Sequence, residues 1–176
     1  MLTESRTDKA CDSALCRLAE GDTEALTVIY NTMKRRIFML AFSILREESA
    51  AEDVMQDTFL KLATEAHAYR PGSNAVAFIL TVTRNLSVNL LHKRRREIPC
   101  AEIGEDMADA AEPDPRPFHA LEALSLLDES DRIIVILKLD CGMKHRAIGA
   151  FLGISEDACR KRYKRALNRL KTYYRS

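Results

Sequence analysis

Hydrophobic residues recur at intervals of three or four along most of the chain, which is the spacing of an amphipathic α-helix. The clearest stripe follows Asp22 and consists of Leu26, Ile29, Met33, Ile37, Leu40 and Ile44. The first half shows no alternation of period two, so it contains no pattern typical of a sheet. The periodicity therefore predicts an all-α fold.

The first half of the chain divides into four expected helices. The first covers about residues 8–20 and stops at Gly21, and the second begins after Asp22 as its N-cap. The third spans about 49–66, where Ser49 and Glu52 have the spacing of a capping box. The stretch 69–74, "YRPGSN", is a turn by composition, and the fourth helix continues from there to about residue 96.

Residues 99–117 have the composition of a linker. They hold four of the five prolines of the chain, six acidic residues and the single base Arg116. Such a segment is expected to stay extended or mobile. It divides the chain into two small helical domains, residues 1–98 and 118–176, joined by an acidic proline-containing linker.

Four further helices are expected after the linker, at about 119–127, 130–140, 144–152 and from 156 onward. Within the second, "IIVIL" (133–137) is rich in β-branched residues and could form a strand. The flanks favour a helix, because "ESDR" resembles a helix start and "CG" resembles a C-cap.

The last two of these helices form a helix-turn-helix pattern, "AIGAFLGIS" followed by "EDACRKRYKRALNRL". At about 100° per residue, Cys159, Tyr163, Ala166 and Leu170 share an inward stripe. The bases face outward, so the helix suits a DNA major groove, although a merely solvated cationic face is the alternative. The candidate contacts are Ser155, Glu156, Asp157, Arg160, Lys161, Arg162, Lys164 and Arg165.

The stretch "AEDVMQDTFLKL" (51–62) has the opposite sign. Its outward face is acidic with an apolar centre and consists of Asp53, Gln56, Asp57 and Leu60. Such a surface suits a basic protein partner rather than DNA, with a solvated face as the alternative.

The fourth helix and the turn before it combine cations, an aromatic ring and side chains that hydrogen-bond bases. They could hold single-stranded DNA and receive an extruded base. Cations near a helix C-terminus are also common for electrostatic reasons, which leaves a structural explanation open. The candidate contacts are Tyr69, Arg70, Ser73, Asn74, Arg84 and Asn85.

Composition narrows the remaining possibilities. The net charge of +1 says little about partners, since the distribution of charge matters more. The five cysteines form no CxxC pair and lack histidines at zinc-ligand spacing, so we expect small buried thiols, with a redox switch as the alternative. We expect no metal, cofactor, signal peptide or membrane-spanning segment, and a cytoplasmic protein. No nucleophile–base pair or glycine-rich phosphate loop supports an enzyme.

In this order, "AEDVMQDTFLKL", "AFILTVTRNLSVNLLHKRRRE" and "LLDESDRIIVILKLDCGMKHRAIGAFLGISEDACRKRYKRAL" resemble the extracytoplasmic-function (ECF) sigma factors of bacterial RNA polymerase. The resemblance implies that the first domain, region 2, docks on the β′ clamp helices of the core polymerase through Asp53, Gln56 and Asp57. It implies that 69–74, Arg84 and Asn85 melt and read the minus-10 promoter element.

The same resemblance implies that the second domain, region 4, binds the β flap and reads the minus-35 element through Arg160, Lys161, Lys164 and Arg165. The linker would thread toward the polymerase active-site and RNA-exit channels. A partner anti-sigma factor is also expected, because hydrophobic edges of both domains would otherwise face water.

Some positions depart from the family pattern. Phe78 replaces a usual tryptophan and Asp128 a common proline, while Ala147, Gly149, Ala158 and Cys159 replace the usual helix-turn-helix residues. These changes are compatible with the fold of the family. They prevent a prediction of the promoter sequence that the chain recognises. Two other functions remain open: a stand-alone helix-turn-helix regulator, and a sigma mimic that binds an anti-sigma factor without starting transcription.

Overall fold

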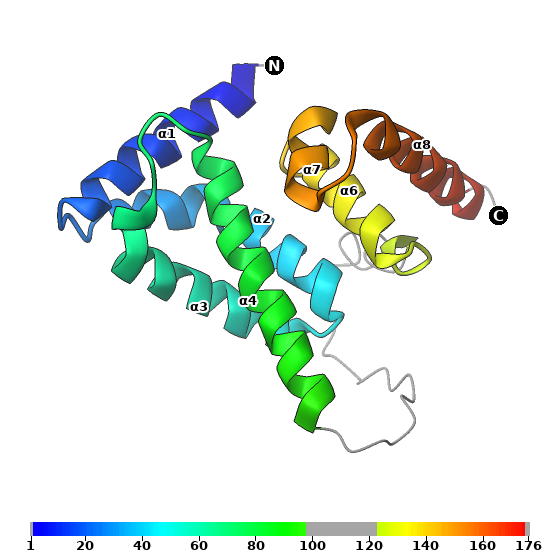
Figure 1. The fold of residues 1–176 in the computed structure, drawn as a ribbon, viewed down its shortest axis with the longest axis horizontal. Coiled ribbons are helices and arrows are strands. Elements are labelled where there is room, and N and C mark those ends of the chain that lie inside the picture. Colours follow the sequence, from blue (N-terminus) through cyan, green and yellow to red (C-terminus); the bar gives the residue numbers. More distant parts are fainter. Residues whose placement is uncertain (1, 98–122, 175–176) are drawn as a thin grey trace.

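A computed structural model describes residues 2–97 and 123–174, which form helices without a strand among them (Figure 1). The all-α prediction is confirmed, while the predicted linker, residues 99–117, lies outside the described residues. The elements are α1 (Leu2–Ala19), α2 (Ala25–Leu45), α3 (Glu48–Glu65), the 3₁₀ turn η1 (Ala66–Ala68), α4 (Ala75–Glu97), α6 (Glu129–Leu139), α7 (His145–Leu152) and α8 (Glu156–Tyr173).

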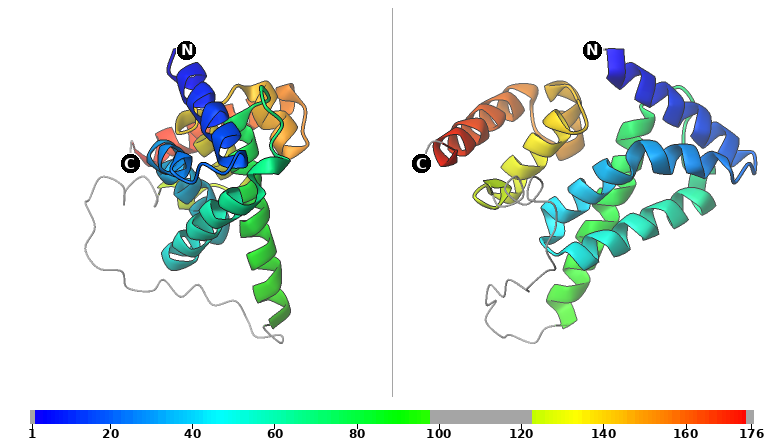
Figure 2. Two further views of the ribbon diagram at one scale, coloured as in Figure 1. Left: turned by 90° about the vertical axis from the view of Figure 1, so that its left-hand side faces the viewer. Right: turned by 180° about the vertical axis from the view of Figure 1, so that it is seen from behind.

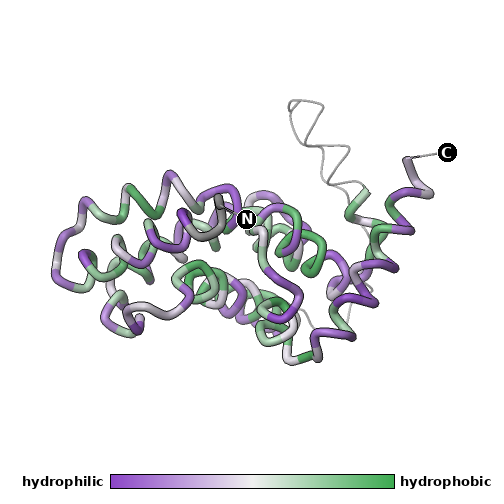
Figure 3. The backbone as a smooth tube through the Cα atoms, turned by 90° about the horizontal axis from the view of Figure 1, so that it is seen from above, coloured by the Kyte–Doolittle hydropathy of each residue, from purple (hydrophilic) through white to green (hydrophobic). Residues whose placement is uncertain are grey.

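Helix α2 is the centre of the first group of helices, and it packs against α1, α3 and α4. Its predicted stripe is buried except for Leu26, which is half-buried. Figure 3 colours the backbone by hydropathy and shows hydrophobic segments on neighbouring helices of the molecule. Burial of this stripe explains why the sequence pattern was so regular here.

Helix α6 occupies the corresponding place in the second group, where it contacts α7 and α8. Seven consecutive residues, 131–137, are buried. A helix surrounded on all sides has no solvent face, which is why "IIVIL" lacks helical periodicity. Asp128 caps this helix by accepting a hydrogen bond from the backbone N–H of Asp131 at 2.8 Å. The position where the family commonly has proline therefore serves here as an N-cap.

The two groups pack against each other through an antiparallel pair formed by α2 and α6 (Figures 1 and 2). At one end, Arg132 Nη1 donates to the Ser43 carbonyl at 2.9 Å, and Nη2 donates to the Leu127 carbonyl at 2.9 Å. At the other end, Arg36 Nε donates to the Asp140 carbonyl at 3.1 Å. The cations thus meet the carbonyl ends of both helices, where the helix dipole favours positive charge.

The interface between the groups is apolar between these arginines. One hydrophobic cluster includes Ile37 and Leu40 of α2 together with Ile134 and Leu137 of α6. Burial lowers the pKa of the Arg132 guanidinium to about 10, so it remains charged at neutral pH. The described chain is therefore a closed arrangement of two helical domains.

Several local expectations about helix ends were wrong. Helix α1 begins at Leu2, earlier than residue 8. The capping box fails because α3 starts at Glu48, which leaves Ser49 inside the helix, donating to the Glu47 carboxylate at 2.9 Å. Asp22 accepts a bond from the backbone N–H of Glu24 at 3.1 Å, but α2 begins only at Ala25, so Asp22 is not its N-cap.

Helix α4 bears on the expectation that the chain has no membrane-spanning segment. Over Ala75–Arg94 it is long and apolar enough to cross a bilayer by length and composition alone. Core helices of soluble proteins meet the same criterion, and α4 packs against α1, α2 and α3 in this fold. The apolar residues of α4 therefore contribute to packing within the first helical group.

Candidate nucleic-acid and protein interfaces

The turn between α7 and α8 is tightly built. Gly153 ends α7 in the left-handed conformation (φ 70°), and Ser155 caps α8 by accepting a hydrogen bond from the Ala158 N–H at 3.2 Å. A Cβ on Gly149 would lie 2.7 Å from the Ile154 carbonyl oxygen. The glycine that departs from the family pattern thus allows the backbone to approach closely. This geometry fixes the angle at which α8 leaves the turn.

Helix α8 is held by its predicted inward stripe. Cys159 and Ala166 are buried, and Tyr163 and Leu170 are half-buried against neighbouring helices. The opposite face carries a groove lined by Lys161, Lys164, Arg165, Asn168, Arg169 and Thr172. The cationic face therefore points to solvent, as the sequence predicted.

The predicted DNA contacts on α8 differ in what already binds them. Lys161 and Lys164 are exposed and make no ion pair with another described residue. Arg160 pairs with Glu156 at 2.9 Å on the surface, a contact that a phosphate can readily replace. Ser155, Glu156 and Asp157 are exposed at the start of the helix, while Arg162 is half-buried.

Arg165, another predicted DNA contact, already has a partner within the protein. Its Nε and Nη2 donate to Asp131 Oδ2 at 3.0 and 2.7 Å, although the Arg165 side chain is 53% exposed and that of Asp131 is fully buried. The carboxylate raises the pKa of Arg165. Withdrawal of Arg165 would leave a buried charge without its partner, which is unfavourable. We therefore assign Arg165 primarily to the attachment of α8 to α6.

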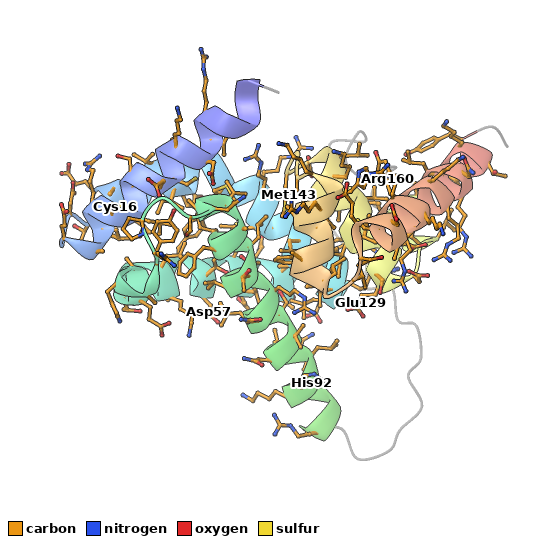
Figure 4. All side chains as sticks on the ribbon, turned by 45° about the horizontal axis from the view of Figure 1, so that its top comes forward. Cys16, Asp57, His92, Glu129, Met143 and Arg160 are labelled. Carbon is orange, nitrogen blue, oxygen red and sulfur yellow. The ribbon has the colours of Figure 1, made fainter. Side chains whose placement is uncertain are left out.

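The acidic face of α3 is exposed. Asp53, Gln56 and Asp57 point to solvent, and Leu60 at their centre is 66% exposed, whereas Ala51, Thr58 and Leu62 opposite them are buried. Figure 4 shows Asp57 on α3 well separated from Arg160 on α8. Acidic and basic surfaces thus occupy different helical groups, with an apolar residue in the acidic one.

Sequence reasoning missed an aromatic neighbour of this face. Tyr30 of α2 is 42% exposed, and its ring lies 5.1 Å from that of Phe59, next to Leu60. Lys34 lies over the Tyr30 ring, with Nζ 5.2 Å from its centroid. Exposed tyrosines are enriched among the residues that dominate protein–protein binding. Its position depends on packing between helices, which no local pattern reveals.

Tyr69, a predicted DNA contact in the turn, is buried in the structure. The side chain is only 6% exposed, its hydroxyl donates to Asp12 Oδ1 at 2.5 Å, and its ring lies 5.3 Å from that of Phe78. A base cannot stack on a ring already covered by the protein. Tyr69 therefore anchors the turn in this arrangement.

The other residues of the turn are exposed, but two of them also shape it. Ser73 Oγ donates to the Arg70 carbonyl at 2.7 Å, and Asn74 Oδ1 accepts from the Ala77 N–H at 2.7 Å at the start of α4. The Arg70 and Asn74 side chains are exposed to solvent. The turn is thus a structured loop that presents polar groups.

Arg84 and Asn85 follow on α4. Asn85 is exposed, whereas Arg84 is half-buried and its guanidinium carbon lies 5.8 Å from the centroid of the Phe151 ring of α7. This contact joins the two helical groups. It places the candidate single-strand surface next to the helix-turn-helix.

Three of the four cysteines in the described residues, Cys11, Cys141 and Cys159, are buried free thiols, and Cys16 is half-buried. Burial raises the pKa of Cys11 to about 11 and that of Cys141 to about 12, which keeps both thiols protonated and unreactive. The expectation of buried thiols is confirmed for these three. Residues 2–97 and 123–174 contain no group of three metal-ligating side chains.

Comparison with protein families identifies both helical groups. The family model for Sigma-70 region 2 matches residues 29–97, and that for Sigma-70, region 4 matches residues 120–170. Together they cover about two thirds of the chain. The chain belongs to the sigma-70 family of RNA polymerase sigma factors. Members of this family give transcription initiation its promoter specificity.

Similar proteins place this sigma factor in the ECF group. It is 29% identical to the RNA polymerase sigma factor CarQ of Myxococcus xanthus, over 88% of this chain and 92% of CarQ. It is 28% identical to the ECF sigma factor SigK of a Mycobacterium species, over 70% of this chain and 62% of SigK. It is also 28% identical to the probable sigma factor RfaY of Xanthomonas campestris, over 84% of this chain but only 40% of RfaY.

Solved structures agree on the fold of this sigma factor. CnrH in complex with the cytosolic domain of CnrY superposes with a TM-score of 0.70, at 21% identity, over 94% of this chain and 97% of that chain. The sigma factor RpoE in complex with the anti-sigma factor NepR from Bartonella quintana superposes with a TM-score of 0.66, at 25% identity. The match covers 83% of this chain and 94% of that chain.

Proposed function

We propose that this sigma factor binds core RNA polymerase through the exposed face of α3 and directs it to promoters through α8 and the loop–α4 surface. The observation that carries the proposal is the separation of charge: an acidic face with an apolar centre in the region 2 domain, and a cationic face in the region 4 domain. The chain itself is proposed not to be an enzyme, since RNA synthesis belongs to the polymerase.

The α3 face would suit a basic surface on the β′ clamp helices. Asp53 and Asp57 supply carboxylates, Gln56 a polar contact, and Leu60 an apolar group that docking would bury. Charged pairs set orientation and association rate, while the buried apolar group supplies affinity. Tyr30, at the edge of this face, would extend the contact.

Helix α8 is proposed to read the minus-35 element as duplex DNA. Its N-terminal residues Ser155, Glu156 and Asp157, together with Arg160, would face base edges, and Lys161 and Lys164 would contact phosphates. Arg162, which is half-buried, would contribute at the edge of this surface. The region 4 domain is also proposed to bind the β flap.

The loop and α4 are proposed to hold the melted minus-10 strand. Arg70, Ser73 and Asn74 are exposed on the loop, and Arg84 and Asn85 follow on α4. Tyr69 would act by anchoring the loop rather than by touching DNA. The buried position of its ring supports this change from the sequence-based prediction.

In the closed arrangement the two DNA surfaces cannot bind both promoter elements at the same time. Arg84 contacts Phe151, and Ser155 follows only four residues later, so the Arg84 and Ser155 backbones are within about 30 Å of each other. The two promoter elements are about 25 base pairs apart, or roughly 85 Å of duplex. We infer that α2 and α6 separate when the chain binds polymerase and a promoter.

An anti-sigma factor is the further partner that we propose, acting in the cytoplasm. Two solved structures to which this chain is similar are complexes, CnrH with CnrY and RpoE with NepR. The exposed apolar side chains Leu60, Leu126 and Leu139 are surfaces that such a partner could cover.

Reconstituted transcription tests the proposal. Core polymerase with and without the full chain is given genomic DNA fragments, and transcript starts are mapped. Discrete starts that depend on the chain are expected. Tight duplex binding without core and without initiation would indicate a stand-alone regulator, and core or anti-sigma binding without initiation would indicate a sigma mimic.

A further inference from the structure

The loop of residues 69–74 is held from outside the matched region 2 domain, by helix α1. A single oxygen of α1, Asp12 Oδ1, accepts the hydroxyl of Tyr69 at 2.5 Å and the backbone N–H of Gly72 at 2.8 Å. One turn earlier on the same helix, Asp8 Oδ1 accepts the N–H of Val76 at 3.1 Å, in the first turn of α4. The family match begins only at residue 29.

These bonds fix the two parts of the loop that determine its shape. Tyr69 is where the chain leaves η1, and Gly72 is the tip, with φ 75° in the left-handed region. The Tyr69 hydroxyl is also 3.1 Å from the Ser73 carbonyl oxygen. Anchoring both points to one carboxylate restricts the loop between them, and the exposed side chains Arg70, Ser73 and Asn74 are carried on that restricted backbone.

The electrostatics agree with a carboxylate that stays charged. Hydrogen bonds from Tyr69 and Gly72 lower the pKa of Asp12, while burial and the neighbouring Asp12 raise the pKa of Tyr69 to about 12. At neutral pH the pair is therefore a phenol donating to a carboxylate, a charge-assisted hydrogen bond.

We propose that Asp12 is a positioning residue for minus-10 recognition: it holds the loop 69–74 in the conformation in which Arg70, Ser73 and Asn74 meet the melted strand. This inference rests on the proposed function of the loop. In this proposal Asp12 acts without touching DNA, since its Oδ1 already accepts from the Tyr69 hydroxyl and the Gly72 N–H. Its effect is transmitted through Tyr69 and Gly72.

The test compares Asp12→Asn, Tyr69→Phe and the double variant in the full chain. A promoter obtained from the transcription experiment is bound by holoenzyme, and melted thymines are detected with permanganate. The matched control is Glu20→Gln, which removes one carboxylate just after the same helix without affecting the loop. Affinity for core polymerase, affinity for a minus-35 duplex and thermal stability are measured for each variant.

Each single change is expected to lower open-complex formation about fivefold, on the order of one hydrogen bond. The double variant should lose less than the product of the two effects, because Asp12→Asn weakens and Tyr69→Phe removes the same hydrogen bond. Core and minus-35 affinities should stay unchanged. The Gly72 amide should exchange faster in Asp12→Asn, because a neutral amide oxygen is a weaker acceptor than a carboxylate.

Three results would overturn the positioning role. They are wild-type melting by Asp12→Asn, independent effects of the two changes, and a parallel loss of core affinity, which indicates general structural damage. If the unaltered chain melts no promoter, the proposed function fails instead. The hydrogen-exchange comparison then still decides whether Asp12 orders the loop.

Discussion

Separation of the two domains can be tested by preventing it. Arg35 of α2 and Asp140 at the end of α6 form an ion pair across the domain interface, Nη2 to Oδ1 at 3.3 Å, and lie outside both candidate DNA surfaces. Replacing both by cysteine, with Cys16 and Cys100 changed to serine, creates a pair for a cleavable thiol cross-linker. A reach of about 10 Å matches the spacing of packed helices.

The expected effect follows from distances. A locked protein keeps Arg84 and Ser155, one residue of each DNA surface, within about 30 Å of each other. Simultaneous contact with both promoter elements needs roughly 85 Å along B-form DNA. Run-off transcription should therefore fall in proportion to the cross-linked fraction, at least tenfold when locking is nearly complete. Cleavage of the cross-linker by reductant should restore run-off transcription.

A pair within the first domain supplies the control. Arg17→Cys with Asp22→Cys replaces another surface ion pair, Nη2 to Oδ2 at 2.6 Å, and should be cross-linked without loss of transcription. If the locked Arg35–Asp140 protein initiates as well as its uncross-linked form, the inferred separation of α2 and α6 is wrong.

Three further measurements examine individual contacts. Lys161→Ala and Lys164→Ala should each weaken duplex binding on every sequence and reduce its log–log salt slope by about 1, whereas Arg165→Ala should chiefly lower the thermal stability of the region 4 domain by leaving buried Asp131 unpaired. Gly149→Ala should destabilise the same domain by about 1–3 kcal/mol in thermal unfolding, because its Cβ meets a backbone oxygen; an unchanged melting temperature would contradict the close approach. Absorbance titration, with Tyr69→Phe for assignment, should place the Tyr69 pKa near 12. Because this pKa is raised on folding, the stabilisation is complete below about pH 10 and is lost as pH rises through 12. Asp12→Asn should lower the pKa of Tyr69.

Local patterns predicted the helices and the two functional faces well. The stripe of α2 and the inward stripe of α8 were read from their spacing alone, because one face of each helix is buried and the other is wet. The same periodicity placed Asp53 and Asp57, and likewise Lys161 and Lys164, on exposed surfaces.

The missed features join residues far apart in the chain. Tyr69 and Asp12 are 57 positions apart, and Arg132 and Ser43 are 89 apart, so no window of sequence contains both partners. Arg165 was assigned to DNA because its helical position suggested a solvated base, yet its partner Asp131 belongs to another helix. Helix ends also shifted by a few residues where capping depends on a single hydrogen bond.

The account depends on charge separation between α3 and α8, and one comparison of binding tests it directly. The affinity of core polymerase for the full chain is measured alongside Asp53→Arg with Asp57→Arg, and alongside Lys161→Glu with Lys164→Glu. We predict that the first pair abolishes core binding while the second leaves it close to that of the unaltered chain. Equal core binding by both variants would contradict the assignment of the α3 face to the polymerase.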